Sequence, residues 1–225
     1  MNHIRIPDSV TQIGDSAFEG CTALDHVVIP KSVKSIGWGA FRGCQSLKDF
    51  VLPPSVKTDG AAFYGCRLLE DDQNLIIFNR AVYICSYRYH PGFGFQGINK
   101  KQQVKIPDGV TRIMSKAFYA AAIETVIFPA GLNSIEESAF EEAMIVEAHI
   151  PDGTKSLGDK AFYKCYYLRE VFIPASVTEI GKNLFGDKEQ HYNTFVPKGL
   201  IVHTPRESKA ESVLKDCLGI IIVND

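Results

Sequence analysis

Cysteine is the residue type in this sequence whose spacing most invites a chemical interpretation. Four of the six cysteines occupy equivalent positions, three residues after a phenylalanine: Cys21, Cys44, Cys66 and Cys165. A zinc site needs ligands that converge from C-x-x-C pairs or similar clusters, and the sequence contains no such pair. We therefore expect these cysteines to be reduced, buried thiols that pack as small hydrophobic side chains.

Other candidate motifs also favour interpretations without catalysis. Gly92-x-Gly94-x-x-Gly97 has the letters of a dinucleotide fingerprint, but no helix pattern follows that could present its N-terminus to a phosphate. The six histidines lack the spacing of a zinc protease motif. Glu147 and Glu170 are expected on adjacent strands, as an acid–base pair or as a solvated rim. The sequence predicts no enzyme, no cofactor and no metal.

A repeated unit must position all of these residues. Prolines recur at spacings of 23, 23, 54, 22, 22 and 23 residues: Pro7, Pro30, Pro53, Pro107, Pro129, Pro151 and Pro174. Aliphatic residues follow three and six positions later except at Thr154 and Asp59, and each unit ends near a phenylalanine: Phe18, Phe41, Phe63, Phe118, Phe140, Phe162 and Phe185. Single units cannot bury their apolar side, so this period predicts coils of 22–23 residues stacked into a solenoid.

The residues before each proline read as a strand. In Leu24-x-x-Val27-x-Ile29-Pro30, alternation places Val27 and Ile29 inward and His26 and Val28 outward. Proline lacks an N–H group and should end the strand. The predicted fold is an α/β solenoid of right-handed coils, with one parallel sheet and a short helical turn opposite each strand.

Two segments interrupt the repeat. Leu75–Phe78 and Ala81–Cys85 flank Asn79-Arg80, which predicts a hairpin with a two-residue turn. A strand near 200–203, a helix near 208–215 and a strand near 220–223 should cap the core. We predict one solenoid over residues 1–225: repeats 1–3 in 1–70, the hairpin insertion in 71–103, repeats 4–7 in 104–197 and the cap in 198–225. Because the sequence starts inside a unit, a fragment of a longer chain is expected.

The outward strand columns are the best candidates for binding. One column reads Arg5, Val28, Val51, Lys105, Ile127, His149 and Phe172, and beside it run His26, Asp49, Gln103, Thr125, Glu147 and Glu170. An apolar strip with a polar border is a common composition for interaction surfaces. The alternative is that β-propensity alone selects these residues.

An aromatic loop after the hairpin is a second candidate. It contains Tyr87, Tyr89, Phe93 and Phe95. These rings could anchor a partner, or they could fold onto the flank of the solenoid where the repeat is broken. Both interpretations stay open at this point.

Charge and hydropathy exclude several partner classes. The 24 basic and 26 acidic residues give a formal net charge of −2, which provides no electrostatic footprint for nucleic acid. No apolar run approaches the roughly 20 residues that cross a bilayer, and the first residues contain no apolar leader. A protein partner is therefore expected.

Residues 29–47 follow the pattern I-P-x-x-V-x-x-I-G-x-x-A-F-x-x-C-x-x-L. This unit resembles the BspA-like, or treponemal-type, leucine-rich repeat, and the resemblance extends over nearly the whole chain. The hairpin also resembles an element found in related bacterial proteins, although Arg80 replaces the usual glycine of its turn. The resemblance implies a secreted or surface-exposed bacterial or protist protein that binds or adheres to a host extracellular or cell-surface protein. The alternative is a structural spacer that presents another domain.

Overall fold

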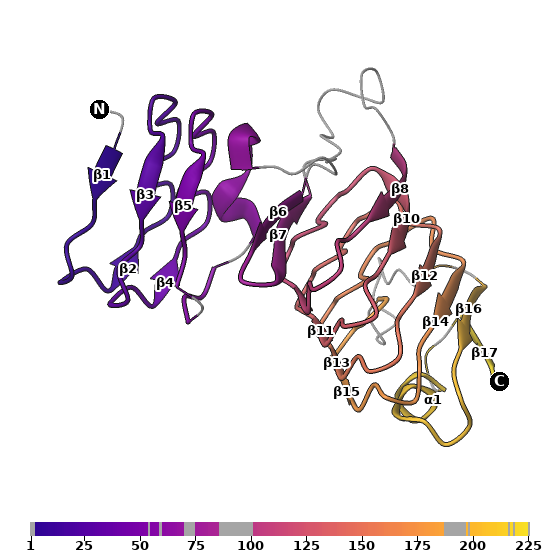
Figure 1. Ribbon diagram of the computed structural model, residues 1–225. Coiled ribbons are helices and arrows are strands. Elements are labelled where there is room, and N and C mark those ends of the chain that lie inside the picture. The colour runs from indigo at the N-terminus through magenta and orange to yellow at the C-terminus, as the bar shows by residue number, and fades with distance from the viewer. Residues whose placement is uncertain are drawn as a thin grey trace. The chain divides into compact units, whose positions relative to one another are not determined.

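A computed structural model describes residues 3–53, 55–58, 60–69, 75–85, 101–186, 197, 199–215, 217 and 219–224. The chain divides into two compact units, Met1–Ser86 and Tyr87–Asp225, called here the N-terminal and C-terminal units (Figure 1). Each is built of coils, and most coils contribute a longer strand to one parallel sheet and a two-residue strand to another. The predicted repeat architecture is confirmed in this form, whereas the predicted boundaries within one continuous solenoid stay a prediction.

The N-terminal unit contains two parallel sheets and a hairpin. The strands before the prolines are β1 (His3–Arg5), β3 (His26–Val28) and β5 (Asp49–Val51), in that order. Shorter strands β2 (Gln12–Ile13) and β4 (Ser35–Ile36) pair with each other. Two 3-10 helices, η1 (Gly60–Phe63) and η2 (Arg67–Leu69), follow. The antiparallel strands β6 (Leu75–Phe78) and β7 (Ala81–Cys85) are joined by Asn79 and Arg80, both at positive φ as a tight hairpin turn requires.

The C-terminal unit repeats this plan. Its larger sheet has the order β17-β16-β14-β12-β10-β8, and all of its strands are parallel. Their bounds are β8 (Lys101–Lys105), β10 (Ile123–Ile127), β12 (Glu147–His149), β14 (Glu170–Phe172), β16 (Leu200–His203) and β17 (Ile220–Val223). Shorter parallel strands β9 (Arg112–Ile113), β11 (Ser134–Ile135), β13 (Ser156–Leu157) and β15 (Glu179–Ile180) pair in sequence order. One α-helix, α1 (Lys209–Leu214), lies between β16 and β17, and Ser208 caps its N-terminus.

The short strands correct the prediction of a single sheet. Each contains an aliphatic residue of the repeat, such as Ile13, Ile36 or Ile135, that is buried in every short strand except β15, where Ile180 is half-buried. Two-residue strands are too short to produce a visible alternation in the sequence, so the pattern showed these residues only as core positions.

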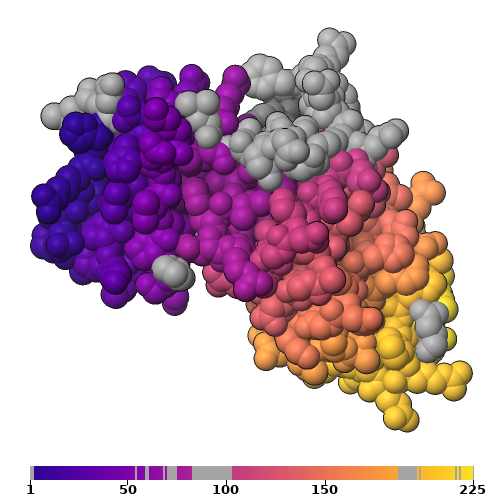
Figure 2. All heavy atoms as spheres, viewed as in Figure 1, coloured from indigo at the N-terminus to yellow at the C-terminus, as the bar shows by residue number. Residues whose placement is uncertain are grey.

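Stacked phenylalanine rings form the centre of both units. In the N-terminal unit the ring centroids of Phe18 and Phe41 are 5.1 Å apart, and those of Phe41 and Phe63 are 5.9 Å apart. In the C-terminal unit Phe140 stacks on Phe118 at 4.6 Å and on Phe162 at 5.2 Å. The repeat therefore places one ring per coil in a stack within each unit, buried except at half-buried Phe18. In Figure 2 the colours show that the coils of each unit follow one another in sequence order.

The predicted helical turns opposite the large sheets are wrong for most coils. Apart from η1, the described phenylalanine segments form hydrogen-bonded turns without helix, because residues near each ring lie at positive φ. Ser138 has φ 54° and Glu142 has φ 61°, two residues before and after Phe140. Left-handed residues interrupt a right-handed helix. The sequence could not predict these left-handed residues, because most of the positions at positive φ are occupied by residues other than glycine.

The turns bond to one another in one direction. The N–H groups of Lys116, Phe118 and Ala120 donate to carbonyls of the next coil at 3.3, 2.7 and 2.8 Å. Ser138, Phe140 and Glu142 donate in the same way at 2.9, 2.8 and 2.9 Å. These inter-coil bonds satisfy backbone groups that a helix would have satisfied internally.

The cysteine column packs as predicted at three of its four positions. Cys44, Cys66 and Cys165 are buried, and each thiol donates to the carbonyl of a phenylalanine in the preceding coil, at 3.1, 3.0 and 2.9 Å. The prediction is wrong for Cys21, which is exposed. Cys21 lies in the first coil of this sequence, where no described coil precedes it to cover the thiol.

We expect a thiol reagent to separate these cysteines in the native protein. Burial raises the pKa of Cys165 and also blocks access, so its thiol should react only after unfolding. The pKa of Cys44 is instead lowered, chiefly by a hydrogen bond with Cys66, so its protection rests on burial alone. A short iodoacetamide pulse followed by peptide mass spectrometry should label Cys21 at least tenfold faster than Cys165. Equal labelling of both in native protein would contradict the packing described here.

Candidate functional site

The outer face of the large sheet in the C-terminal unit brings the predicted columns together. Residues of adjacent strands stand in direct register, so Lys105, Ile127, His149 and Phe172 form one column. Gln103, Thr125, Glu147 and Glu170 form the next, with Glu147 aligned to both Thr125 and Glu170. The alternate strand residues Val126, Ala148 and Val171 are buried. The columns therefore face outward, as alternation predicts.

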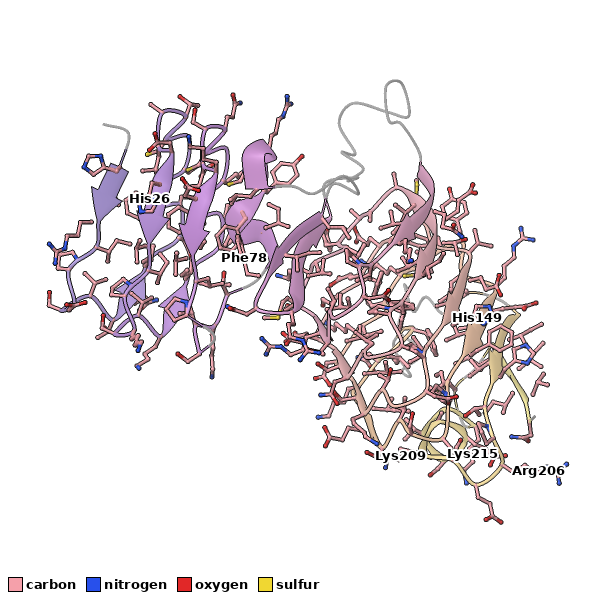
Figure 3. The ribbon with its side chains drawn as sticks, in the orientation of Figure 1. His26, Phe78, His149, Arg206, Lys209 and Lys215 are labelled. Atoms are coloured by element: carbon pink, nitrogen blue, oxygen red, sulfur yellow. The ribbon has the colours of Figure 1, made fainter. Side chains whose placement is uncertain are left out.

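The N-terminal unit carries a smaller version of this face. Val28 and Val51 are adjacent in register and 47% and 54% exposed. His26 is paired with Asp49 in the neighbouring column, and Figure 3 labels His26 on β3. Two exposed valines and a polar border match the predicted composition, on a short sheet of three strands.

Three aromatic rings stack on the outer face of the C-terminal unit. The centroids of His149 and Phe172 are 4.1 Å apart with the planes inclined by 9°, and those of Phe172 and His203 are 4.2 Å apart at 6°. His149 is the labelled residue on β12 in Figure 3. The parallel register across β12, β14 and β16 produces this stack directly, because equivalent side chains leave neighbouring strands in the same direction.

His203 is a member of the stack that the sequence analysis missed as a site residue. It belongs to β16, the strand before Pro205, and Pro205 lies 31 residues after Pro174 instead of 22 or 23. The analysis of the 22–23-residue period therefore did not include this strand in the outward column. Its register with Phe172 provides the missing assignment. The stack continues on one side to Ile127, which is 39% exposed and precedes His149 in the same column.

Two carboxylates border the stack. Glu147 contacts the imidazole Nε2 of His149, two residues away on the same strand. Glu170 is in register with Glu147 and half-buried. Together these groups can make hydrogen bonds, ion pairs and apolar contacts with another molecule.

The described residues offer little for metal or bond-making chemistry on this face. Within the described part of the chain, no three histidine, cysteine, aspartate or glutamate side chains are placed to share a metal ion. The described helices also include none that is long and apolar enough to cross a membrane. The outer face therefore presents groups that can contact another molecule.

A second exposed cluster, in the N-terminal unit, escaped the sequence analysis. The guanidinium of Arg42 lies 5.7 Å from the ring centroids of both Trp38 and Tyr64. Arg42 also pairs with Glu19 at 3.5 Å, and Glu19 accepts a hydrogen bond from Ser16 at 2.5 Å. Glu19, Arg42 and Tyr64 each follow the phenylalanine of successive coils and so share one repeat position, and Trp38 lies in the same coil as Arg42. The sequence analysis followed only the strand columns and did not consider this position as a site. Aromatic faces hold a guanidinium by cation–π attraction, which makes this cluster a stable exposed feature.

A hollow of about 700 Å³ lies over the short strands of the C-terminal unit, with Lys209 of α1 among its lining residues. Ser134, Ser156 and Glu136 are among its polar lining residues. Burial raises the pKa of Glu136, although Arg112 at 3.8 Å opposes the shift. The hollow is broad and polar, and no sequence motif marked it.

The predicted aromatic anchors Tyr87, Tyr89, Phe93 and Phe95 lie outside the described residues. Their two interpretations, partner contact or packing on the flank, stay predictions.

Comparison with known proteins agrees with the coils described above. A family model for the BspA type leucine rich repeat region matches residues 1–87 and 91–201, in six copies. Comparison with curated proteins finds no match.

The fold is also similar to solved structures. One is a leucine-rich repeat protein from Bacteroides ovatus, at 23% identity over 98% of this chain and 69% of that chain, with a TM-score of 0.40. Another is a leucine rich cell surface protein from Faecalibacterium prausnitzii, at 20% identity over 100% of this chain and 79% of that chain, with a TM-score of 0.34. A third is the pneumococcal vaccine antigen PcpA, at 16% identity over 100% of this chain and 78% of that chain, with a TM-score of 0.45.

Proposed function

Because the chain belongs to the BspA-type leucine-rich repeat family, we propose that it is a binding module that holds a protein partner on the outer face of its C-terminal sheet. The observation that carries the proposal is the outward-facing stack of His149, Phe172 and His203, of which His149 is exposed and the other two are half-buried, on the same face as exposed Ile127. Large apolar and aromatic groups gathered on one exposed face mark interaction surfaces.

The backbone supports this role. The strands beneath the stack are fixed by parallel pairing on both sides, and their inward residues Ala148 and Val171 are buried. A partner would therefore meet a surface that needs little ordering, which reduces the entropic cost of association. The described carboxylates and imidazoles at the border add hydrogen-bonding groups that fix orientation.

A location outside the cell, secreted or on the surface, is part of the proposal. It rests on the family, whose resemblance implies attachment to host or cell-surface proteins. Antibodies against the purified chain should then label intact cells of the source organism without permeabilisation. Labelling that appears only after lysis would contradict this location.

The binding face is tested by charge insertion. Phe172→Asp and Ile127→Asp should each weaken binding at least tenfold, about 1.4 kcal/mol, because a carboxylate would have to be desolvated at the contact. The partner is first isolated by pull-down from extracellular host proteins and bacterial surface proteins, and affinities are then measured by surface plasmon resonance.

Tyr166→Asp is the matched control. Tyr166 is also an exposed aromatic residue, but it lies in a turn outside the large sheet, so its replacement should leave binding unchanged. Circular dichroism must show the parent fold for all three variants. If both sheet variants bind like the parent, the outer face is not the site, and a spacer that presents another domain becomes the better interpretation.

A further inference from the structure

Two like charges stand side by side on the proposed face without a cation between them. Glu147 and Glu170 are aligned in register on adjacent parallel strands. Like charges directly opposite each other destabilise a sheet. Glu147 contacts only the imidazole of His149 on its own strand, and within the described part of the chain Glu170 has no ion pair or hydrogen bond from its side chain. Glu147 thus has one imidazole partner and Glu170 none among the described residues, and a position that breaks a local stability rule is a candidate for function.

The described basic residues lie elsewhere or do not bind these carboxylates. Arg206, Lys209 and Lys215 are grouped around α1, away from His149 in Figure 3. Lys105 is in the outward column but on β8, and β10 separates it from β12. Arg169 precedes Glu170, and no ion pair joins the two among the described contacts.

The aromatic stack limits what a cation could contact here. Both faces of Phe172 are covered, one by His149 and the other by His203. The ring therefore offers its edge, which carries partial positive charge and favours apolar or anionic contact. A cation must be recognised by the carboxylates, and an apolar group next to it by Phe172 and Ile127.

We propose that Glu147 and Glu170 select a basic partner. A lysine or arginine side chain of an extended segment binds between the two carboxylates, and the adjacent apolar side chain of that segment lies against Phe172 and Ile127. The bound cation attracts both carboxylates and so offsets their mutual repulsion. Charge-assisted hydrogen bonds between the cation and the carboxylates hold the segment in place. This inference rests on the proposed function and names the partner's chemistry.

The test uses phage-displayed random 12-residue peptides selected on the full chain. We expect selected peptides to contain lysine or arginine next to an aliphatic or aromatic residue. The best such peptide, synthesised with a fluorophore, should bind the double variant Glu147→Gln, Glu170→Gln at least tenfold more weakly than the parent. Its affinity for the parent should also fall as NaCl rises from 50 to 500 mM, because the contact is partly ionic.

The control variant Asp108→Asn, Asp152→Asn removes the same charge from two exposed turn positions and should bind like the parent. Two outcomes would overturn this inference and leave the proposed function standing. In both, the selected peptides bind the Phe172→Asp variant more weakly than the parent. In the first outcome the peptides show no preference for lysine or arginine, and in the second they bind the glutamine double variant as tightly as the parent. Failure to recover any peptide that depends on Phe172 or Ile127 would count against both.

Discussion

Replacing Phe140 with alanine should lower the free energy of unfolding by about 3–5 kcal/mol, the range for losing a fully buried phenylalanine. Phe140 is completely buried and stacks on the rings before and after it, with Phe128 at its edge, 5.8 Å between centroids. The variant would leave a gap in the middle of the stack, where neither flanking coil can move without breaking its inter-coil bonds. Urea unfolding followed by far-ultraviolet circular dichroism measures the loss.

Phe172→Ala provides the comparison within the same unit. Phe172 stacks on two rings on the outside of the sheet, so its removal should cost less than that of Phe140, roughly 1–3 kcal/mol for two aromatic pair contacts. If the two variants lost equal stability, the buried stack would not be the main support of the C-terminal unit.

Gly37→Ala should lower the free energy of unfolding by about 1–3 kcal/mol through overpacking. Gly37 follows Ile36 of β4, where the backbone of the preceding coil lies close to its Cα. A methyl group there would lie 2.6 Å from the backbone nitrogen of Asp15 and 2.8 Å from the carbonyl carbon of Gly14. Backbone atoms cannot rotate away as a side chain can, so the coils must separate. Fluorescence of Trp38, the only tryptophan of the chain, reports unfolding beside the site.

Gly14→Ala is a control at the same position of the repeat. No atom lies within 4 Å of a methyl group at Gly14. The substitution should therefore leave stability unchanged, or raise it by about 0.4–1 kcal/mol through a less flexible unfolded chain. A loss at Gly14 equal to that at Gly37 would show that backbone conformation, and not coil spacing, explains the glycine.

The large sheets were predictable because two signals coincide at each strand. Alternation places Val27 and Val171 inward, and the proline that follows two or three residues later ends the ladder. The phenylalanine stack followed from the same period. Repetition supplies many independent copies of one local rule, so a departure in a single coil does not obscure it.

The turns were not predictable, because their backbone contradicts the preferences of their residues. Lys116, Ser138 and Lys160 adopt positive φ, at 59°, 54° and 56°, where most residues other than glycine are disfavoured. Hydrogen bonds to the next coil stabilise them there, and a single coil read alone contains no sign of its neighbour.

The residues of the candidate site also fall into two groups, those that the sequence could predict and those that it could not. Ile127, His149 and Phe172 were predicted as outward by alternation, and the register places them side by side. His203 lies outside the 22–23-residue period, and the Trp38–Arg42 contact within one coil depends on side-chain reach, which spacing does not record. Sequence thus identified the face, and only the structure identified the stack on it.

The one-way hydrogen bonds of the phenylalanine turns have an electrical consequence. In a β-ladder successive peptide groups point to opposite sides and their dipoles largely cancel. In these turns the N–H groups of Lys116, Phe118 and Ala120 all point to the following coil, and the carbonyls they bond point back. The peptide dipoles therefore add along the stacking direction, as they do along an α-helix, but with the positive pole toward the later coils. Each added coil of this kind lengthens the array, so such a unit carries an axial dipole moment that grows with its number of repeats.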